Sequence, residues 1–77
     1  MKAMILAAGK GSRLSPLTDK TPKPLLPIQG RPLIEYIVKS LAREGYDQIV
    51  INLHHLGHQI IEFLGDGSRY RVNITYS

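Results

Sequence analysis

The sequence predicts an α/β fold, a parallel sheet with helices on both faces. A continuous apolar run over residues 3–8 is typical of a strand that is covered on both faces, as in a parallel sheet. Two helix-like segments then alternate with two further strand-like segments, and strand-helix-strand crossovers imply parallel pairing. Three strands in this order form half of a doubly wound domain, in which ligands bind outside the carboxyl ends of the strands.

The first predicted helix covers residues 32–44. Pro32 suits the first helical position, and Gly45 suits the left-handed position after the last turn. Apolar residues at i, i+3, i+4 and i+7 predict its buried stripe, which consists of Ile34, Ile37, Val38 and Leu41. Glu35 and Lys39 form an i, i+4 pair that we expect on the solvent side.

Two more strands and a short helix complete the predicted order. β-branched residues predict a strand over residues 48–53. The short helix, residues 58–64, is expected to turn Ile60, Ile61 and Leu64 inward. The last strand, residues 71–77, alternates apolar and polar side chains. Its expected buried face carries Val72, Ile74 and Tyr76.

Length and composition limit the class of protein. The chain has 77 residues, a net charge of +4 and no cysteine, so a disulfide framework and a thiolate metal site are excluded. We expect residues 1–77 to be one part of a single domain that is truncated at its C-terminal end. No apolar run approaches the roughly 20 residues that span a bilayer, and the first apolar stretch is too short for a signal peptide. A cytoplasmic protein is therefore expected.

Positive charge is concentrated early in the chain. Residues 1–31 carry six basic side chains and one acidic side chain, whereas residues 32–77 carry four basic and five acidic ones. This excess follows the first predicted strand and indicates an anionic ligand there. Charge alone also fits nucleic acid or a solvated basic surface.

A glycine-rich segment, AAGKGSRL over residues 7–14, follows the first strand. Glycines let the backbone approach a ligand closely, and successive free N–H groups can bind an anion. The dinucleotide fingerprint does not fit, because Leu14 stands where it needs a third glycine, and the Walker A loop lacks its four-residue spacer. Prolines within residues 16–27 exclude a long helix and predict a loop over residues 9–31. Interleaved apolar side chains, among them Leu17 and Leu25, indicate that this loop is ordered.

Three segments together resemble the signature of the sugar-phosphate nucleotidyltransferases. They are LAAGKGSRL (residues 6–14), PLT (residues 16–18) and TPKPLLP (residues 21–27), and the likeness covers the whole chain. It implies the N-terminal, nucleotide-binding portion of a Rossmann-like nucleotidyltransferase fold. It also implies an enzyme that couples a nucleoside triphosphate to a sugar 1-phosphate and releases pyrophosphate.

The run over residues 49–60 looks like the N-acetylmuramate 1-phosphate uridylyltransferases of cell-wall recycling, which favours UTP. Mannose 1-phosphate guanylyltransferases and glucose 1-phosphate thymidylyltransferases share much of it. A nucleotide-sensing domain or a nucleic-acid-binding module without catalysis would use the same basic loop. We expect no nucleic-acid or membrane partner, and nothing in the sequence indicates the oligomeric state or the sugar.

The resemblance implies roles for individual residues. The implied nucleotide-binding residues are Ala8, Gly9, Gly11, Ser12, Arg13 and Lys23. The backbone at Ala8 and Gly9 lies against the nucleobase in this scheme. Arg13 and Lys23 are the implied catalytic residues, because a forked guanidinium suits the leaving pyrophosphate and an ammonium supplies a point charge at the α-phosphate.

The same resemblance implies Mg²⁺, with its aspartate ligands beyond residue 77. None of Asp19, Asp47 and Asp66 matches the metal positions of the family, so we expect no metal ligand and no turnover from these 77 residues alone. A histidine cluster follows the second strand, at His54, His55 and His58. No cysteine or nearby carboxylate completes a metal set there, which favours polar loop and helix-start roles over a zinc site.

Overall fold

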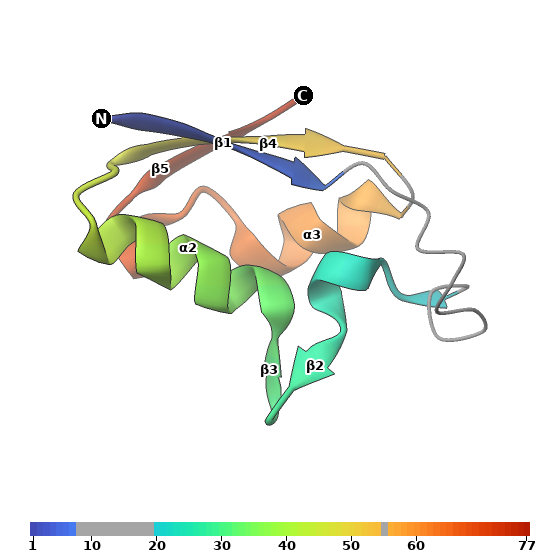
Figure 1. Cartoon of the computed structure of the whole chain (residues 1–77). Coiled ribbons are helices and arrows are strands. Elements are labelled where there is room, and N and C mark those ends of the chain that lie inside the picture. Colours follow the sequence, from blue (N-terminus) through green and yellow to red (C-terminus); the bar gives the residue numbers. More distant parts are fainter. Residues whose placement is uncertain (8–19, 55) are drawn as a thin grey trace.

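A three-stranded parallel sheet forms one layer of the molecule (Figure 1). In this computed structural model, residues 1–7, 20–54 and 56–77 are described. The strands are β1 (Lys2–Ala7), β4 (Gln48–Leu53) and β5 (Asn73–Tyr76). β4 lies in the middle and pairs in parallel with both neighbours, from Lys2 opposite Gln48 to Ala7 opposite Leu53. The predicted parallel sheet is confirmed.

Two α-helices connect the strands and lie against the same face of the sheet (Figure 1). They are α2 (Leu33–Arg43) and α3 (Gly57–Leu64). Because the strand order runs in one direction and both crossovers are right-handed, both helices fall on one side. Among the described residues the opposite face is open, and its Met4 and Leu6 are 65% and 76% exposed. The cover that the apolar run of β1 predicts on that second face is not supplied by the described residues.

The regular elements begin and end close to their predicted positions. β4 covers the predicted residues 48–53, and β5 is shorter than the predicted residues 71–77 because it begins at Asn73 and ends at Tyr76. Pro32 is the N-cap of α2 rather than its first helical residue, and α3 begins one residue early, at Gly57. In the described part of the chain, neither helix is long and apolar enough to cross a bilayer. The predicted cytoplasmic location stays a prediction.

The segment before α2 contains short elements that the sequence did not predict. A 3₁₀ turn, η2 (Lys23–Leu25), leads into a hairpin of β2 (Pro27–Ile28) and β3 (Arg31–Pro32). The two hairpin-turn residues, Gln29 and Gly30, both have positive φ, as the tight turns that match strand twist require. A second 3₁₀ turn, η3 (Ser68–Tyr70), precedes β5. Elements of two or three residues are too short to produce a periodic signal.

The core lies between the sheet and the two helices. Its buried apolar residues are Ala7, Ile34, Val38, Ile49, Ile51, Ile60, Leu64, Val72 and Ile74. The predicted alternation in the last strand is confirmed, since Val72 and Ile74 are buried while Asn73 and Thr75 are exposed. Two predictions of burial are wrong: Ile37 and Ile61 are 36% and 42% exposed. A helix that packs on one sheet buries a narrow stripe, so residues at its margin stay in contact with water.

Glu35 also departs from its predicted place, because it is buried rather than on the solvent side of α2. Only 7% of the residue is exposed. Its carboxylate accepts hydrogen bonds from Arg31 at 2.7 Å and from the Tyr70 hydroxyl at 2.9 Å. The predicted i, i+4 ion pair with Lys39 is confirmed, with 3.6 Å between the Lys39 ammonium and the carboxylate. A buried charge needs partners of this kind, and the partner from η3 is 35 residues away in sequence.

Neighbouring isoleucines in α3 provide a test of this packing. Ile60→Ala should lower the free energy of unfolding by about 2–5 kcal/mol, because a fully buried side chain leaves a cavity. Ile61→Ala, one position later and 42% exposed, should cost well under half as much. Urea unfolding of the full-length protein followed by circular dichroism measures both. Equal losses would show that the orientation of α3 is wrong.

Candidate functional site

The candidate site lies at the edge of the sheet where β1 and β4 end. Ala7, the last residue of β1, is paired with Leu53, the last residue of β4, and is buried. The glycine-rich segment follows Ala7 directly, as predicted from the order of elements. Five of the predicted nucleotide-binding residues lie outside the described residues: Ala8, Gly9, Gly11, Ser12 and Arg13. The sixth, Lys23, is described.

Lys23 stands on a short, well-anchored turn. Pro22 before it has φ −64° and a fully buried side chain. Two backbone hydrogen bonds close the turn, from the Leu25 N–H to the Pro22 carbonyl at 2.9 Å and from the Leu26 N–H to the Lys23 carbonyl at 3.1 Å. The Lys23 residue is exposed, and its ammonium has no hydrogen-bond or ion-pair partner among the described residues. A rigid backbone therefore presents an available cation.

Two cavities meet at Lys23. The first, of about 240 Å³, is lined by Lys23 together with Ile5, Leu6, Ala7, Pro24, Leu33, Ile34 and Ile37. The second, of about 230 Å³, is lined by Lys23, Leu26, Ile28 and Leu33. The structure thus brings Lys23 beside the end of β1, from which it is separated by 15 residues of chain. Apolar walls strengthen the attraction of a cation for an anion, because little water screens the charge.

Helix α2 holds the segment that carries Lys23. The Leu33 N–H donates to the Leu26 carbonyl at 3.1 Å, and the Tyr36 hydroxyl donates to the Ile28 carbonyl at 2.7 Å. These hydrogen bonds hold the β2–β3 hairpin against the first turns of α2. Because η2 leads directly into the hairpin, its position is restricted as well. Sequence reasoning missed the role of Tyr36, because an isolated tyrosine on a helix gives no signal of its partner.

Helix α3 holds the same segment from its other end. The Gln59 side-chain amide donates to the Lys20 carbonyl at 2.8 Å. Lys20 begins the described range that contains Lys23. This hydrogen bond therefore connects the chain just before η2 to α3. Gln59 was also missed: a glutamine in a helix is normally a solvated residue, and only its position in the fold gives it this partner.

The carboxylate of Glu35 stabilises the hairpin electrostatically. The hydrogen bond from Arg31 and then the one from Tyr70 lower the pKa of Glu35. The same bonding raises the pKa of Arg31, while burial and the bond to Glu35 raise the pKa of Tyr70. Glu35 is therefore ionised at neutral pH and joins β3, α2 and η3 in one network. The i, i+4 spacing of Arg31 and Glu35 is a signal that the sequence contained.

The two described aspartates, Asp47 and Asp66, lie at the edge of the sheet opposite to Lys23. Asp47 precedes β4 and accepts a hydrogen bond from the N-terminal ammonium at 3.0 Å, and Asp66 lies in the turn before η3 and accepts one from the Ser68 N–H at 2.9 Å. Both interactions lower the pKa values of these carboxyls. These carboxylates therefore do not fit a magnesium site beside Lys23. Asp19 lies outside the described residues.

Two of the three clustered histidines are described, and both are exposed. His54 follows β4, and His58 lies in the first turn of α3. Among residues 1–7, 20–54 and 56–77, no group of three histidine, cysteine or acidic side chains is arranged to hold a metal ion. His55 lies outside these ranges, so the interpretation of the cluster as polar loop and helix-start residues stays a prediction.

Comparison with known proteins identifies the family. Residues 2–77 match the family described as nucleotidyl transferase. The chain belongs to this family. It is 60% identical over its whole length to the N-acetylmuramate alpha-1-phosphate uridylyltransferase of Neisseria meningitidis serogroup B, of which it covers 33%. It is 48% identical, again over its whole length, to the UTP–glucose-1-phosphate uridylyltransferase of a Synechocystis species, of which it covers 20%.

Solved structures of nucleotidyltransferases share the fold. The CTP:phosphocholine cytidylyltransferase of Streptococcus pneumoniae superposes with a TM-score of 0.81 at 41% identity, over 99% of this chain and 32% of that one. A UDP-glucose pyrophosphorylase superposes with a TM-score of 0.85 at 24% identity, over 99% of this chain and 34% of that one, which supports the fold alone. The predicted Rossmann-like nucleotidyltransferase fold is confirmed, and the chain spans about a third of the length of these structures.

Acid should weaken the Glu35 network. A lowered folded-state pKa contributes stability that is present above the unfolded pKa and is lost as pH falls through the folded value. The free energy of unfolding of the wild type should therefore fall between neutral pH and about pH 3. The free energy of unfolding of the Glu35→Gln variant should fall less over the same interval, because the glutamine side chain does not titrate. Glu62→Gln, an exposed residue of α3, is the matched control. A Glu35→Gln variant as acid-sensitive as the wild type would contradict the role of this carboxylate.

Proposed function

We propose that the protein transfers a nucleoside monophosphate from a nucleoside triphosphate, with UTP favoured, to a sugar 1-phosphate. The products are a nucleotide sugar and pyrophosphate. The observation that carries the proposal is the position of Lys23 beside the end of β1, where the family signature begins. A cation at the carboxyl edge of a parallel sheet lies where such folds bind their ligands.

In the proposed reaction a phosphate oxygen of the sugar 1-phosphate attacks the α-phosphorus in line. A new P–O bond forms as the bond from the α-phosphorus to the bridging oxygen breaks, and pyrophosphate leaves with that electron pair. Transfers of this type depend on positioning and charge stabilisation more than on a covalent protein group. We assign Arg13 to the leaving pyrophosphate and Lys23 to the α-phosphate.

The anchoring of Lys23 supports its role. A cation stabilises a transition state most when it need not reorganise during the reaction. The buried Pro22, the two hydrogen bonds of η2 and the bond from Gln59 to the Lys20 carbonyl all restrict the backbone that carries it. In the same proposal the backbone at Ala8 and Gly9 contacts the nucleobase.

The remaining phosphate contacts come from Gly11 and Ser12 in this proposal. We also propose Mg²⁺ as the cofactor, which supplies charge neutralisation at phosphate oxygens when bound. Its ligands are expected beyond residue 77, since Asp47 and Asp66 face the opposite edge of the sheet. The roles assigned to Arg13 and Lys23 do not depend on it.

Relatives support UTP as the favoured nucleotide. Two uridylyltransferases are 60% and 48% identical to the chain, whereas a Streptomyces griseus glucose-1-phosphate thymidylyltransferase and a Yarrowia lipolytica mannose-1-phosphate guanyltransferase are 33% and 42% identical. A cytidylyltransferase that acts on choline phosphate is 40% identical, so the N-terminal portion does not determine the acceptor by itself. Thymidylyl and guanylyl transfer are the alternative activities.

Removal of either catalytic cation should reduce turnover while the fold is retained. Lys23→Ala and Arg13→Ala in the full-length protein should each lower kcat/KM by about 10²-fold or more, the usual cost of one lost transition-state donor. Pyrophosphate release measures the rate, and circular dichroism checks folding. Lys10→Ala, in the same loop, is the control and should have a smaller effect. Unchanged kcat/KM in Lys23→Ala would remove Lys23 from the mechanism.

The choice of nucleotide is tested by a panel. UTP, dTTP, GTP and CTP are each paired with N-acetylmuramate, glucose and mannose 1-phosphates, and pyrophosphate release is followed. The highest kcat/KM is expected with UTP. A preference for dTTP or GTP would establish the alternative activity. Nucleotide binding without pyrophosphate release in every pairing would instead indicate a sensing domain, and steeply salt-dependent oligonucleotide binding that UTP does not displace would indicate a nucleic-acid module.

A further inference from the structure

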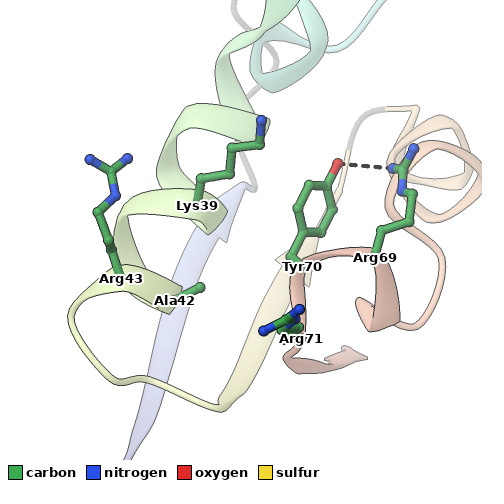
Figure 2. Close-up of a pocket in the computed structure, with 6 residues that line it drawn as sticks. All are labelled: Lys39, Ala42, Arg43, Arg69, Tyr70 and Arg71. Carbon is green, nitrogen blue, oxygen red and sulfur yellow. Dashed lines mark hydrogen bonds between the residues drawn. The ribbon is translucent and has the colours of Figure 1, made fainter.

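A third cavity has mostly basic walls (Figure 2). Its volume is about 430 Å³, and its lining residues are Lys39, Ala42, Arg43, Arg69, Tyr70 and Arg71. Four of the six are cationic and none is acidic. Figure 2 shows Lys39 and Arg43 extending from α2 and Tyr70 and Arg71 from the segment that faces it. We call this space the basic cavity.

The basic cavity is at the amino-terminal edge of the sheet. Arg43 ends α2 shortly before β4 begins, and Arg71 precedes the start of β5 by two residues. Parallel strands begin at the same edge, so these residues lie at the end opposite to Ala7 and Lys23. Six residues of β4 separate the two edges by about 20 Å, at roughly 3.3 Å per residue. One small ligand cannot contact both places.

The wall formed by Tyr70 and Arg69 is already fixed. The Arg69 guanidinium donates to the Tyr70 hydroxyl at 2.9 Å and to the Phe63 carbonyl, and its carbon lies 5.0 Å and 5.1 Å from the ring centroids of Tyr70 and Phe63. The Tyr70 hydroxyl donates in turn to the buried Glu35. Because these side chains are already ordered in the free protein, they lose little conformational entropy when a ligand binds.

The other three cations keep donors available. Arg43 and Arg71 are exposed and have no hydrogen-bond or ion-pair partner among the described residues. The Lys39 ammonium is 3.6 Å from Glu35, too far for a good hydrogen bond, and its side chain is 44% exposed. An Arg side chain offers up to five N–H donors and a Lys side chain three, so the opening of the cavity is rich in donors and poor in acceptors.

Arg71 occupies a backbone position that favours glycine. Arg71 adopts left-handed dihedral angles, φ 61° and ψ 34°. Such angles are unfavourable for a residue with a Cβ, whereas glycine adopts them without strain. Nearby turn positions with positive φ are occupied by Gly65 and Gly67. Glycine can therefore replace Arg71 without strain in the backbone.

We propose that the basic cavity binds a small polyphosphate anion, with Lys39, Arg43 and Arg71 as its charged contacts. Its volume is within the range of small-molecule sites, and the paired N–H groups of a guanidinium match phosphate oxygens. A cavity lined by one sign of charge concentrates counterions of the opposite sign. This proposal is independent of the proposed enzymatic function, because the cavity shares no residue with the candidate site.

The test is calorimetric titration of the full-length protein with inorganic tripolyphosphate. The double variant Arg43→Ala/Arg71→Gly should bind at least about tenfold more weakly than the wild type, since each lost charge-assisted bond is worth a factor of this order. The part of the binding that the double variant removes should persist in Lys23→Ala, because Lys23 lies at the other edge of the sheet. Lys2→Ala, an exposed cation outside the cavity, is the matched control and should also retain it.

Arg71→Gly alone separates charge from folding. Glycine relieves the strained backbone, so the ligand-free melting temperature should stay the same or rise while tripolyphosphate binding weakens. Arg71→Lys should restore part of the binding. No binding to the wild type, unchanged binding in the double variant, or a loss that occurs only in Lys23→Ala would each overturn the proposal.

A parallel titration with ATP distinguishes the source of the phosphates. Tripolyphosphate and ATP share the chain of phosphates, but ATP adds a base that could stack on the Tyr70 ring. Tighter cavity-dependent binding of ATP would identify a nucleotide as the ligand, and tighter binding of tripolyphosphate would identify a free polyphosphate. If the double variant weakens neither, the basic cavity is not an anion site.

Discussion

The parallel pairing of β4 with both β1 and β5 is the constraint on which the other features depend. Its inward side chains Ile49 and Ile51 are almost completely buried, and strands on both sides satisfy its backbone. Parallel strands must be joined by crossovers, and right-handed crossovers place α2 and α3 on one face. The same pairing gathers carboxyl ends at one edge and amino ends at the other. The positions of both charged regions follow from that separation.

Glu35 connects these two regions through hydrogen bonds. Its carboxylate accepts from Arg31, which belongs to the hairpin beyond Lys23, and from Tyr70, which forms a wall of the basic cavity. A buried carboxylate is tolerated because these donors, with Lys39 nearby, compensate its lost hydration. Removal of one partner would leave the buried charge only partly compensated. The network therefore fixes the relative positions of the hairpin, α2 and η3 rather than adding only to stability.

Charge along the sequence and charge in space give different descriptions of this protein. The sequence has its positive excess in residues 1–31, which indicates an anionic ligand after the first strand. Residues 32–77 carry more acidic than basic side chains, so they gave no such signal. Folding separates these charges, because Lys39, Arg43 and Arg71 line one cavity while Asp47 and Glu62 lie outside its lining. The net charge of a stretch of sequence does not show which charged side chains lie together in the fold.

Local patterns determined the regular elements of this protein. The β-branched run over residues 48–53 and the stripe through Ile34 and Val38 each exceed one period of their repeat, so burial on one face is visible without knowledge of partners. The signature over residues 6–27 likewise indicated the family, since its order of residues is local information. For the candidate site, the signature predicted glycine and basic residues and placed them at the carboxyl end of the first strand.

Only the tertiary structure decided which distant residues meet. The partner of Glu35 in η3, the bond from Gln59 to the Lys20 carbonyl and the exposure of Ile61 all depend on how α2 and α3 lie on the sheet. No periodicity records the distance between segments that are separated by 35 or 39 residues. The sequence therefore determined the regular elements and the family. Packing determined the network that holds Lys23 and the cavity at the other edge, because contacts across a core arise only when the elements are assembled.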